Sequence, residues 1–479
     1  MAYLIIVTIF TLIIISRFII NDRLSKIIIM MYLIWWGIWL GLSTFNFYDL
    51  FSVQTSTYLL LILNVVMFYI GFLFCGEFRD KDKINFNKKY INDKVSKHFG
   101  FLKLLIIIVF ILLYYWLRYR NVVYSGISSN NRMERFSAGN VFSSAPEILA
   151  YNYFISSFMF AAIIILAYMI IYGEFKNITF ILLALSIFFY AGIGSGRGSV
   201  MDVLIAMTLI FSIRKIDLRK KISINNLIVK TGKAKKNRLW SILFIGLIVL
   251  IIFVYSSWLT ASRMGHTKFN IESIEIGWNE FFKQGIIYYT GPFRALDYGL
   301  KVYPQSVGYL FGRGTFAGVD EIINMAFRII GVKYSSANEI VGGLLQNNYI
   351  QIGDAQIFNY AYTSVMIHYF DLGIWGVIIF PFFYGFFIRK AIFLYERKPM
   401  LPTLIIVVFL FNTMINSVFK WGLQSPASNI VLVGCYFWYK YNKSYKENKY
   451  ISDINLKINK KEHNNEYIMA NQYSTSRSK

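Results

Sequence analysis

The chain has 479 residues, of which 56% are hydrophobic and 19% aromatic, and its formal net charge is +24. A soluble protein of this size cannot bury that much apolar surface, so the composition excludes a soluble enzyme or binding module. The charge would suggest nucleic acid in a soluble protein, but here the basic residues lie in loops between apolar runs. We therefore attribute the charge to membrane topology and expect no nucleic-acid partner.

The apolar runs have roughly the 20 residues needed to cross a bilayer, which predicts an all-α, polytopic membrane protein of about 11 transmembrane helices. The predicted helices cover residues 3–20, 27–45, 57–76, 101–118, 150–172, 177–194, 199–213, 240–258, 372–388, 400–418 and 427–440. A long outer loop, 259–371, precedes the last three of them. We expect a single transmembrane domain over residues 1–440 and a basic, disordered tail at 441–479.

The basic loops predict the orientation of the chain. Segments 77–103, 214–238 and 440–479 hold eight, ten and nine Lys or Arg residues. The positive-inside rule places these segments in the cytoplasm, so an odd number of helices leaves the N-terminus outside and the C-terminus inside. The apolar run 357–370 would reverse the last helices if it crossed the bilayer. We therefore expect it to be a shallow or re-entrant segment that leads into the helix at 372.

The two faces differ in their basic residues, because nine of the 14 assigned to the outer face are Arg, whereas Lys predominates inside. These arginines are Arg118, Arg120, Arg132, Arg135, Arg197, Arg263, Arg294, Arg313 and Arg328. The planar guanidinium binds phosphate through two parallel hydrogen bonds and stays charged when partly buried. The outer face is therefore predicted to hold an anion, most simply a phosphate or pyrophosphate. The alternative is that these arginines pair with outer acids such as Glu272, Asp297 and Asp320.

A glycine-rich turn, Gly192–Gly198, joins two predicted helices at their outer ends. Glycines such as Gly196 let the backbone approach a ligand closely, and the following helix N-terminus adds a positive dipole end. Arg197 within the turn would complete an anion site. A tight connection between helices is the alternative explanation of the glycines.

Two further positions are candidates for acid–base chemistry. Asp371 lies where the outer loop re-enters the membrane, and a carboxylate there needs either a partner or a function. A helix N-cap is an equally simple explanation of Asp371. His266 opens the large outer loop beside Arg263, where it is a candidate base or a hydrogen-bond donor to phosphate.

Four short motifs together resemble a known family. They are the Gly194–Gly198 turn, Arg132-Met133-Glu134-Arg135-Phe136, the Tyr309–Phe316 segment around Arg313, and Asn359 followed by Tyr362-Thr363, Tyr369–Gly373 and Gly376. With the predicted topology, they resemble the oligosaccharide repeat-unit polymerases of bacterial O-antigen and capsule assembly, the Wzy-like family. O-antigen ligases are its distant kin.

The resemblance implies a metal-independent glycosyltransferase of the bacterial plasma membrane, without a cofactor. It would transfer the growing glycan from undecaprenyl pyrophosphate to the non-reducing-end hydroxyl of the next lipid-linked unit, for O-antigen, capsule or exopolysaccharide. Membrane lipid, a chain-length regulator and a flippase are the implied partners. The expected catalytic residues are Arg197, Arg263, His266 and Asp371, and the expected substrate-binding residues are Arg132, Arg135, Gly196, Arg294, Arg313, Arg328 and Asn359.

Two alternatives stay open on the sequence. An O-antigen ligase would differ only in its acceptor, but Phe358-Asn359 stands where those ligases carry a His-Asn pair. A flippase or other transporter of the lipid-linked oligosaccharide would usually have inverted repeats and broken helices, and neither is visible in the sequence.

Overall fold

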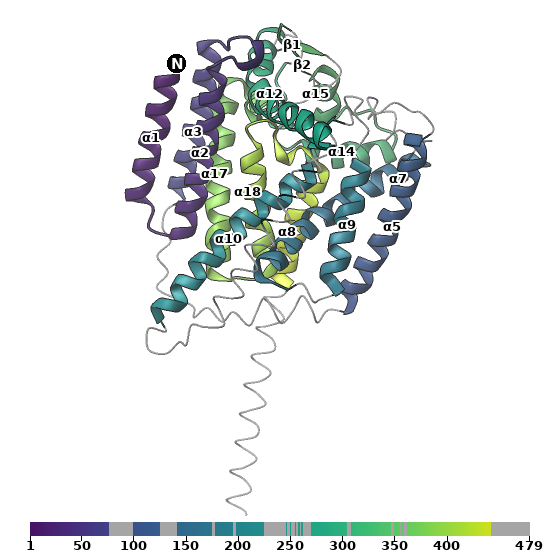
Figure 1. Ribbon diagram of the computed structural model, residues 1–479. Helices are drawn as coiled ribbons and strands as arrows, with labels where there is room; N and C mark the ends of the chain where they lie inside the picture. Colours follow the sequence, from purple (N-terminus) through teal and green to yellow (C-terminus); the bar gives the residue numbers. More distant parts are fainter. Residues whose placement is uncertain are drawn as a thin grey trace, which may run out of the picture.

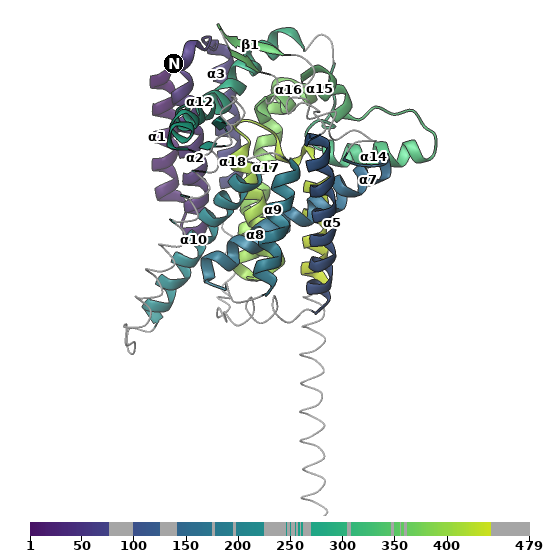
Figure 2. The ribbon, with the colours of Figure 1, turned by 45° about the vertical axis from the view of Figure 1, so that its right-hand side comes forward.

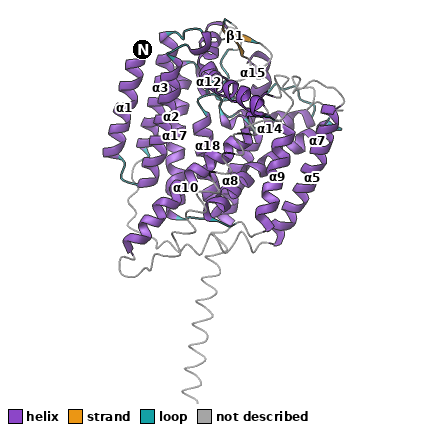
Figure 3. Ribbon diagram, in the orientation of Figure 1, coloured by secondary structure: helices purple, strands orange, loops and turns teal. Residues whose placement is uncertain are grey.

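The computed structural model of the chain is a helical bundle with a smaller layer of helices and one hairpin across one end (Figure 1, Figure 3). The structure describes residues 1–75, 99–124, 141–174, 178–194, 198–224, 270–303, 308–345, 349–354, 356–358 and 362–441, together with isolated positions between 246 and 261. The predicted all-α fold is thus confirmed in outline, with the short hairpin as an addition.

The bundle contains the helices that the apolar runs predicted. They are α1 (Ala2–Ile19), α2 (Arg23–Ser43), α3 (Thr55–Phe74), α5 (Phe99–Tyr124), α7 (Ala145–Ala150), η2 (Tyr151–Ile155), α8 (Ser156–Tyr172), α9 (Ile178–Gly194), α10 (Gly198–Ile224), α17 (Ile374–Arg397), α18 (Leu401–Asn416) and a last helix at 426–441. The predicted helix at 240–258 falls mostly outside the described residues.

Six helices are long and apolar enough to cross a membrane, which supports the expectation of a membrane protein. They are Ala2–Ile19, Arg23–Ser43, Thr55–Phe74, Leu102–Val122, Ala145–Tyr172 and Ile374–Arg397. Shorter apolar helices lie at Ile178–Ile193 and Leu401–Asn416. Their packing buries a continuous core in which α3 lies along α17 and α8 lies against α10.

The segment that precedes α17 folds into a layer across the upper end of the bundle in Figures 1 and 2, which we call the capping layer. It consists of α12 (Ile271–Val302), α14 (Ala317–Ile329), α15 (Ala337–Leu345), β1 (Ile350–Gly353), β2 (Gln356–Phe358) and α16 (Ser364–Leu372). Strands β1 and β2 are antiparallel, with Ile350 opposite Phe358. The turns η1 (Phe47–Asp49) and η3 (Gly422–Gln424) lie at the same end, because Phe51 N donates to Ile352 O and Asn338 Nδ2 to Gln424 O.

Of the predicted shallow segment 357–370, residues 357–358 belong to β2 and residues 364–370 lie in the short helix α16. Its nine residues span only about 14 Å, too little to cross a bilayer. The chain reverses at Gly373, whose φ of +61° is a conformation that L side chains rarely adopt. A Cβ at Gly376 would lie 1.8 Å from His368 O, so this glycine lets α17 pack directly on α16. The interpretation of Asp371 as a helix N-cap is wrong, because Asp371 lies near the end of α16 and the N-cap of α17 is Gly373.

Candidate functional site

The structure places four of the predicted site residues, Arg294, Arg313, Arg328 and Asp371, in or beside the capping layer. The others lie outside the described residues, so their roles stay predictions. They are Arg132, Arg135, Gly196, Arg197, Arg263, His266 and Asn359.

Asp371 anchors the loop that carries Arg313. The side chain is 0% exposed, and its Oδ1 and Oδ2 accept hydrogen bonds from the backbone N–H groups of Gly314 (2.7 Å) and Thr315 (2.6 Å). A Cβ at Gly314 would lie only 3.0 Å from Oδ1, so the contact depends on glycine. Burial raises the pKa of Asp371, against the opposing effect of these N–H donors. Because both oxygens are engaged and enclosed, we assign Asp371 a positioning role rather than the expected role of general base.

His368 extends the same anchor. Its Nδ1 lies 3.0 Å from Thr315 Oγ1, and the indole of Trp421 donates to Thr315 O at 2.7 Å. The imidazole is 1% exposed and meets the Trp421 ring edge-on, with ring centroids 4.8 Å apart. Burial lowers the pKa of His368 to about 3. At neutral pH this histidine is therefore an uncharged part of the packing.

We assign Arg294 a structural role in place of the expected role in substrate binding, because its guanidinium is enclosed and bonded within the protein. It is 4% exposed, and its nitrogens donate to Phe51 O (2.6 Å), Ser43 O (3.1 Å) and Asn46 Oδ1 (3.0 Å). A fourth bond runs to Thr290 O within its own helix. One turn along α12, the carboxylate of Asp297 accepts from Lys301, Gln54 N and Thr57. Arg294 and Asp297 thus hold α12 against the α2–α3 connection. Each nitrogen of the Arg294 guanidinium donates in these bonds, so the side chain cannot bind a phosphate through two parallel hydrogen bonds.

Arg313 pairs with an acid. This agrees with the alternative explanation of the outer arginines, in which they pair with acidic residues rather than bind an anion. Its Nε donates to Asp320 Oδ1 at 3.1 Å, and its guanidinium lies 4.6 Å from the centre of the Tyr334 ring. Burial raises the pKa of Asp320, but hydrogen bonds from Arg313, Tyr334 and the N–H of Ala337 outweigh it and hold the pKa below its ordinary value. This ionic cluster ties α14 to the start of α15.

Arg328 is the one described site residue whose guanidinium remains largely open. Its side chain is 61% exposed and is oriented by a single ion pair from Nη2 to Glu339. Among the described residues, its Nε and Nη1 have no hydrogen-bond partner. Asn324 Nδ2 and the N–H of Ser336 also donate to Glu339, at 3.3 Å each, which fixes the carboxylate in front of α14.

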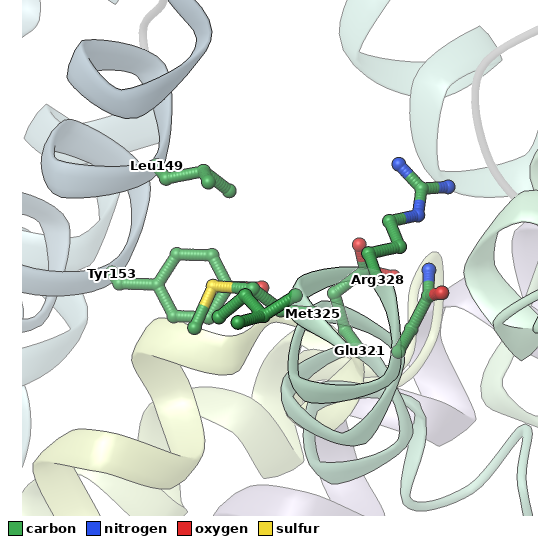
Figure 4. A pocket seen from close by; sticks show the side chains of 7 residues that line it. Leu149, Tyr153, Glu321, Met325 and Arg328 are labelled. Carbon is green, nitrogen blue, oxygen red and sulfur yellow. The ribbon is translucent and has the colours of Figure 1, made fainter. Parts of the chain in front are cut away.

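Arg328 stands at the rim of a pocket of about 240 Å³ between α14 and the helix that begins at α7 (Figure 4). The lining residues are Leu149 and Tyr153 on one side and Glu321, Asn324, Met325, Arg328 and Ile329 on α14. Figure 4 shows Leu149 and Tyr153 extending toward α14, while the guanidinium of Arg328 rises away from Tyr153. The pocket therefore combines an apolar wall with a cation at its mouth.

Two buried polar atoms of residues that line this pocket have no partner in the described part of the chain. They are the hydroxyl of Tyr153, a residue 7% exposed, and Oδ1 of Asn324, a residue 1% exposed. An enclosed polar atom without a hydrogen bond is costly, so it calls for water or a ligand. Tyr153 also belongs to the π-helical turn η2, a rare geometry that is frequent at functional sites.

The sequence did carry a signal for this pocket. Positions 321, 324, 325, 328 and 329 recur at helical spacing and therefore share one face of a helix. The opposite side of the pocket, at Leu149 and Tyr153, has no such local signal, because it reaches α14 only through the tertiary fold.

Comparison of the chain with protein-family models, with curated proteins and with solved structures finds no match.

Proposed function

We propose that the chain is a polymerase of lipid-linked oligosaccharides in the bacterial plasma membrane, with about 11 transmembrane helices. The capping layer and the N-terminus then face outward, and the basic tail faces the cytoplasm. The enzyme transfers a growing glycan from undecaprenyl pyrophosphate to the non-reducing-end hydroxyl of the next unit. The resemblance of the outer motifs to the Wzy-like family supplies the reaction.

The observation that best supports this proposal is the pocket under Arg328. A polyprenyl diphosphate needs an apolar channel for its lipid and a cation for its head group, side by side at the membrane surface. Leu149, Met325 and Ile329 supply the apolar side, and the guanidinium of Arg328 supplies the cation. The pocket also lies beside Ala145–Tyr172, a helix long and apolar enough to cross a membrane.

The chemistry gives Arg328 a defined task. In the transfer, the acceptor oxygen bonds to the anomeric carbon while the bond from that carbon to the diphosphate oxygen breaks. The departing diphosphate gains negative charge, which a fixed guanidinium stabilises more than it stabilises the substrate. Nε and Nη1 of Arg328 are the donors placed to do this, while Glu339 holds the side chain in position.

The direct test is reconstitution. Lipid-linked oligosaccharide is extracted from a strain that lacks the gene and is mixed with the purified full-length chain in vesicles. We expect the single units to disappear into a ladder of longer lipid-linked glycans, with release of undecaprenyl diphosphate. A transporter would instead move the units across the bilayer without making any new bond, and that result would contradict the proposal.

Arg328 offers a matched pair of variants for the same assay. Arg328→Lys keeps the charge but loses the fork, and we expect about a tenfold slower polymerisation with unchanged folding. Lys333→Gln removes an exposed cation of the same layer that does not line the pocket, and it serves as the control. Equal rates for wild type and Arg328→Lys would remove Arg328 from the site.

A further inference from the structure

A second polar cluster lies in the bundle between α10 and α18, at the end that the capping layer covers. Asp202 Oδ1 accepts hydrogen bonds from Asn412 Nδ2 (2.9 Å) and Asn416 Nδ2 (3.4 Å). Asn416 also donates to Asn412 Oδ1 at 2.9 Å. Both helices are otherwise apolar here, and polar or ionisable groups inside such a bundle are costly and usually functional.

Only some of the polar atoms in this cluster have hydrogen-bond partners. Asp202 Oδ2 and Asn416 Oδ1 have no hydrogen-bond partner within the described ranges. Two acceptors of the cluster therefore remain for a ligand. A purely structural network would be expected to use both carboxylate oxygens, as the one at Asp371 does.

Donors and aromatic rings surround these acceptors. Lys420 interacts electrostatically with Asp202 but does not form an ion pair with it, and its ammonium lies 5.5 Å from the centre of the Phe419 ring. Tyr289 on α12 also interacts electrostatically with Asp202. Its ring stacks on Trp39 at 4.3 Å and meets Phe419 edge-on at 5.7 Å.

The charges decide which ligand fits. An inorganic cation would be repelled by Lys420, and a phosphate would be repelled by Asp202, so the cluster favours a neutral molecule. A neutral ligand with several hydroxyls can donate to Asp202 and Asn416 and accept from Lys420. Its C–H faces can pack on the Tyr289 ring. A sugar has this combination of hydroxyls and apolar faces.

We propose that this cluster binds the acceptor sugar and that Asp202 is its general base. The catalytic step rests on the proposed polymerase function. The acceptor hydroxyl gives its proton to Oδ2 of Asp202 as its oxygen bonds to the anomeric carbon, and the electron pair of the broken glycosyl–oxygen bond leaves with the diphosphate. The Arg328 pocket holds the donor end of the reaction, and the Asp202 cluster holds the acceptor end.

The test uses the purified full-length chain in vesicles with the lipid-linked oligosaccharide from the deletion strain. Asp202→Asn keeps the shape and should slow turnover by a factor of about 10² or more. Lys420→Met removes an exposed donor without burying a charge and should raise KM about tenfold with a smaller change in kcat. Asp49→Asn, an exposed carboxylate at the same end of the bundle, is the matched control.

A binding measurement separates this inference from the polymerase function. Native mass spectrometry of the same lipid-linked oligosaccharide should give weaker binding for Lys420→Met and Asn416→Ala than for wild type, even if no polymer forms. If wild type polymerises and Asp202→Asn is equally fast, the inference is overturned while the function stands. If none of the variants changes binding or turnover, or wild type neither binds nor polymerises, the acceptor site is disproved.

Discussion

Two carboxylates at the same end of the bundle, Asp371 and Asp202, have opposite environments. Asp371 is fully enclosed, and each of its oxygens accepts a backbone N–H. Asp202 uses one oxygen for two side-chain amides, and its other oxygen has no partner among the described residues. The first arrangement holds a loop in place, and the second leaves an acceptor for a ligand.

The same contrast separates the two arginines of the capping layer. Arg294 donates to backbone carbonyls of three segments and is 4% exposed, whereas Arg328 has one ion pair and a side chain 61% exposed. Residue type and position alone would assign the same role to both carboxylates and the same role to both arginines. The number of unsatisfied atoms that reach open space distinguishes a structural residue from a candidate site residue.

Removing the Asp371 carboxylate should have the largest effect on folding. Asp371→Ala leaves the N–H groups of Gly314 and Thr315 without partners inside the protein, each costing about 1–3 kcal/mol. We expect the melting temperature in detergent to fall strongly and protein yield with it. Unchanged melting would show that this anchor does not hold the loop.

Arg294→Lys should have the second-largest effect on stability. Lysine cannot reach the carbonyls of Ser43 and Phe51 and Oδ1 of Asn46 together, so we expect a loss of about 2 kcal/mol. Limited proteolysis of the α2–α3 connection should speed up along with the drop in melting temperature. A variant as stable as wild type but unable to bind substrate would reverse our assignment of Arg294.

The buried His368 predicts a pH dependence of stability. Its pKa is lowered to about 3 in the folded protein, so between pH 6.5 and 3 the unfolded chain binds the proton and the folded chain does not. Stability is therefore complete above pH 6.5 and is lost as the pH falls, by up to about 1.4 kcal/mol per pH unit. Melting curves of wild type and His368→Gln at pH 7 and pH 5 measure this, and the variant should lose less. Parallel losses in both proteins would assign the pH effect to other groups.

Arg328→Met should have the smallest effect on stability. The ion pair to Glu339 is largely exposed, and such pairs contribute about 0–1 kcal/mol. The melting temperature should stay close to that of wild type while polymerisation falls. A large drop in melting temperature would place Arg328 with Arg294 among the structural residues.

The bundle was predictable from sequence because apolar runs of bilayer length are a local signal, and α1 and α3 follow the predicted ranges closely. The capping layer was not predictable from sequence, because α12 is held by polar contacts to a loop 243 residues away in the sequence. The Asp202 cluster likewise joins residues 210 and 214 positions apart, so no local pattern marks it. The motif at Tyr309–Phe316 contains a loop in which the N–H groups of Gly314 and Thr315 donate to Asp371.

The proposed enzyme transfers a glycan at the end of the bundle that the capping layer covers. The most direct measurement is the product ladder that the reconstituted chain makes from single lipid-linked units, compared for wild type, Asp202→Asn and Asp371→Asn at equal amounts of folded protein. We predict a full ladder for wild type and for folded Asp371→Asn, and a ladder that forms about 10² times more slowly or not at all for Asp202→Asn. Single units left unchanged by well-folded wild type would contradict the proposed polymerase activity.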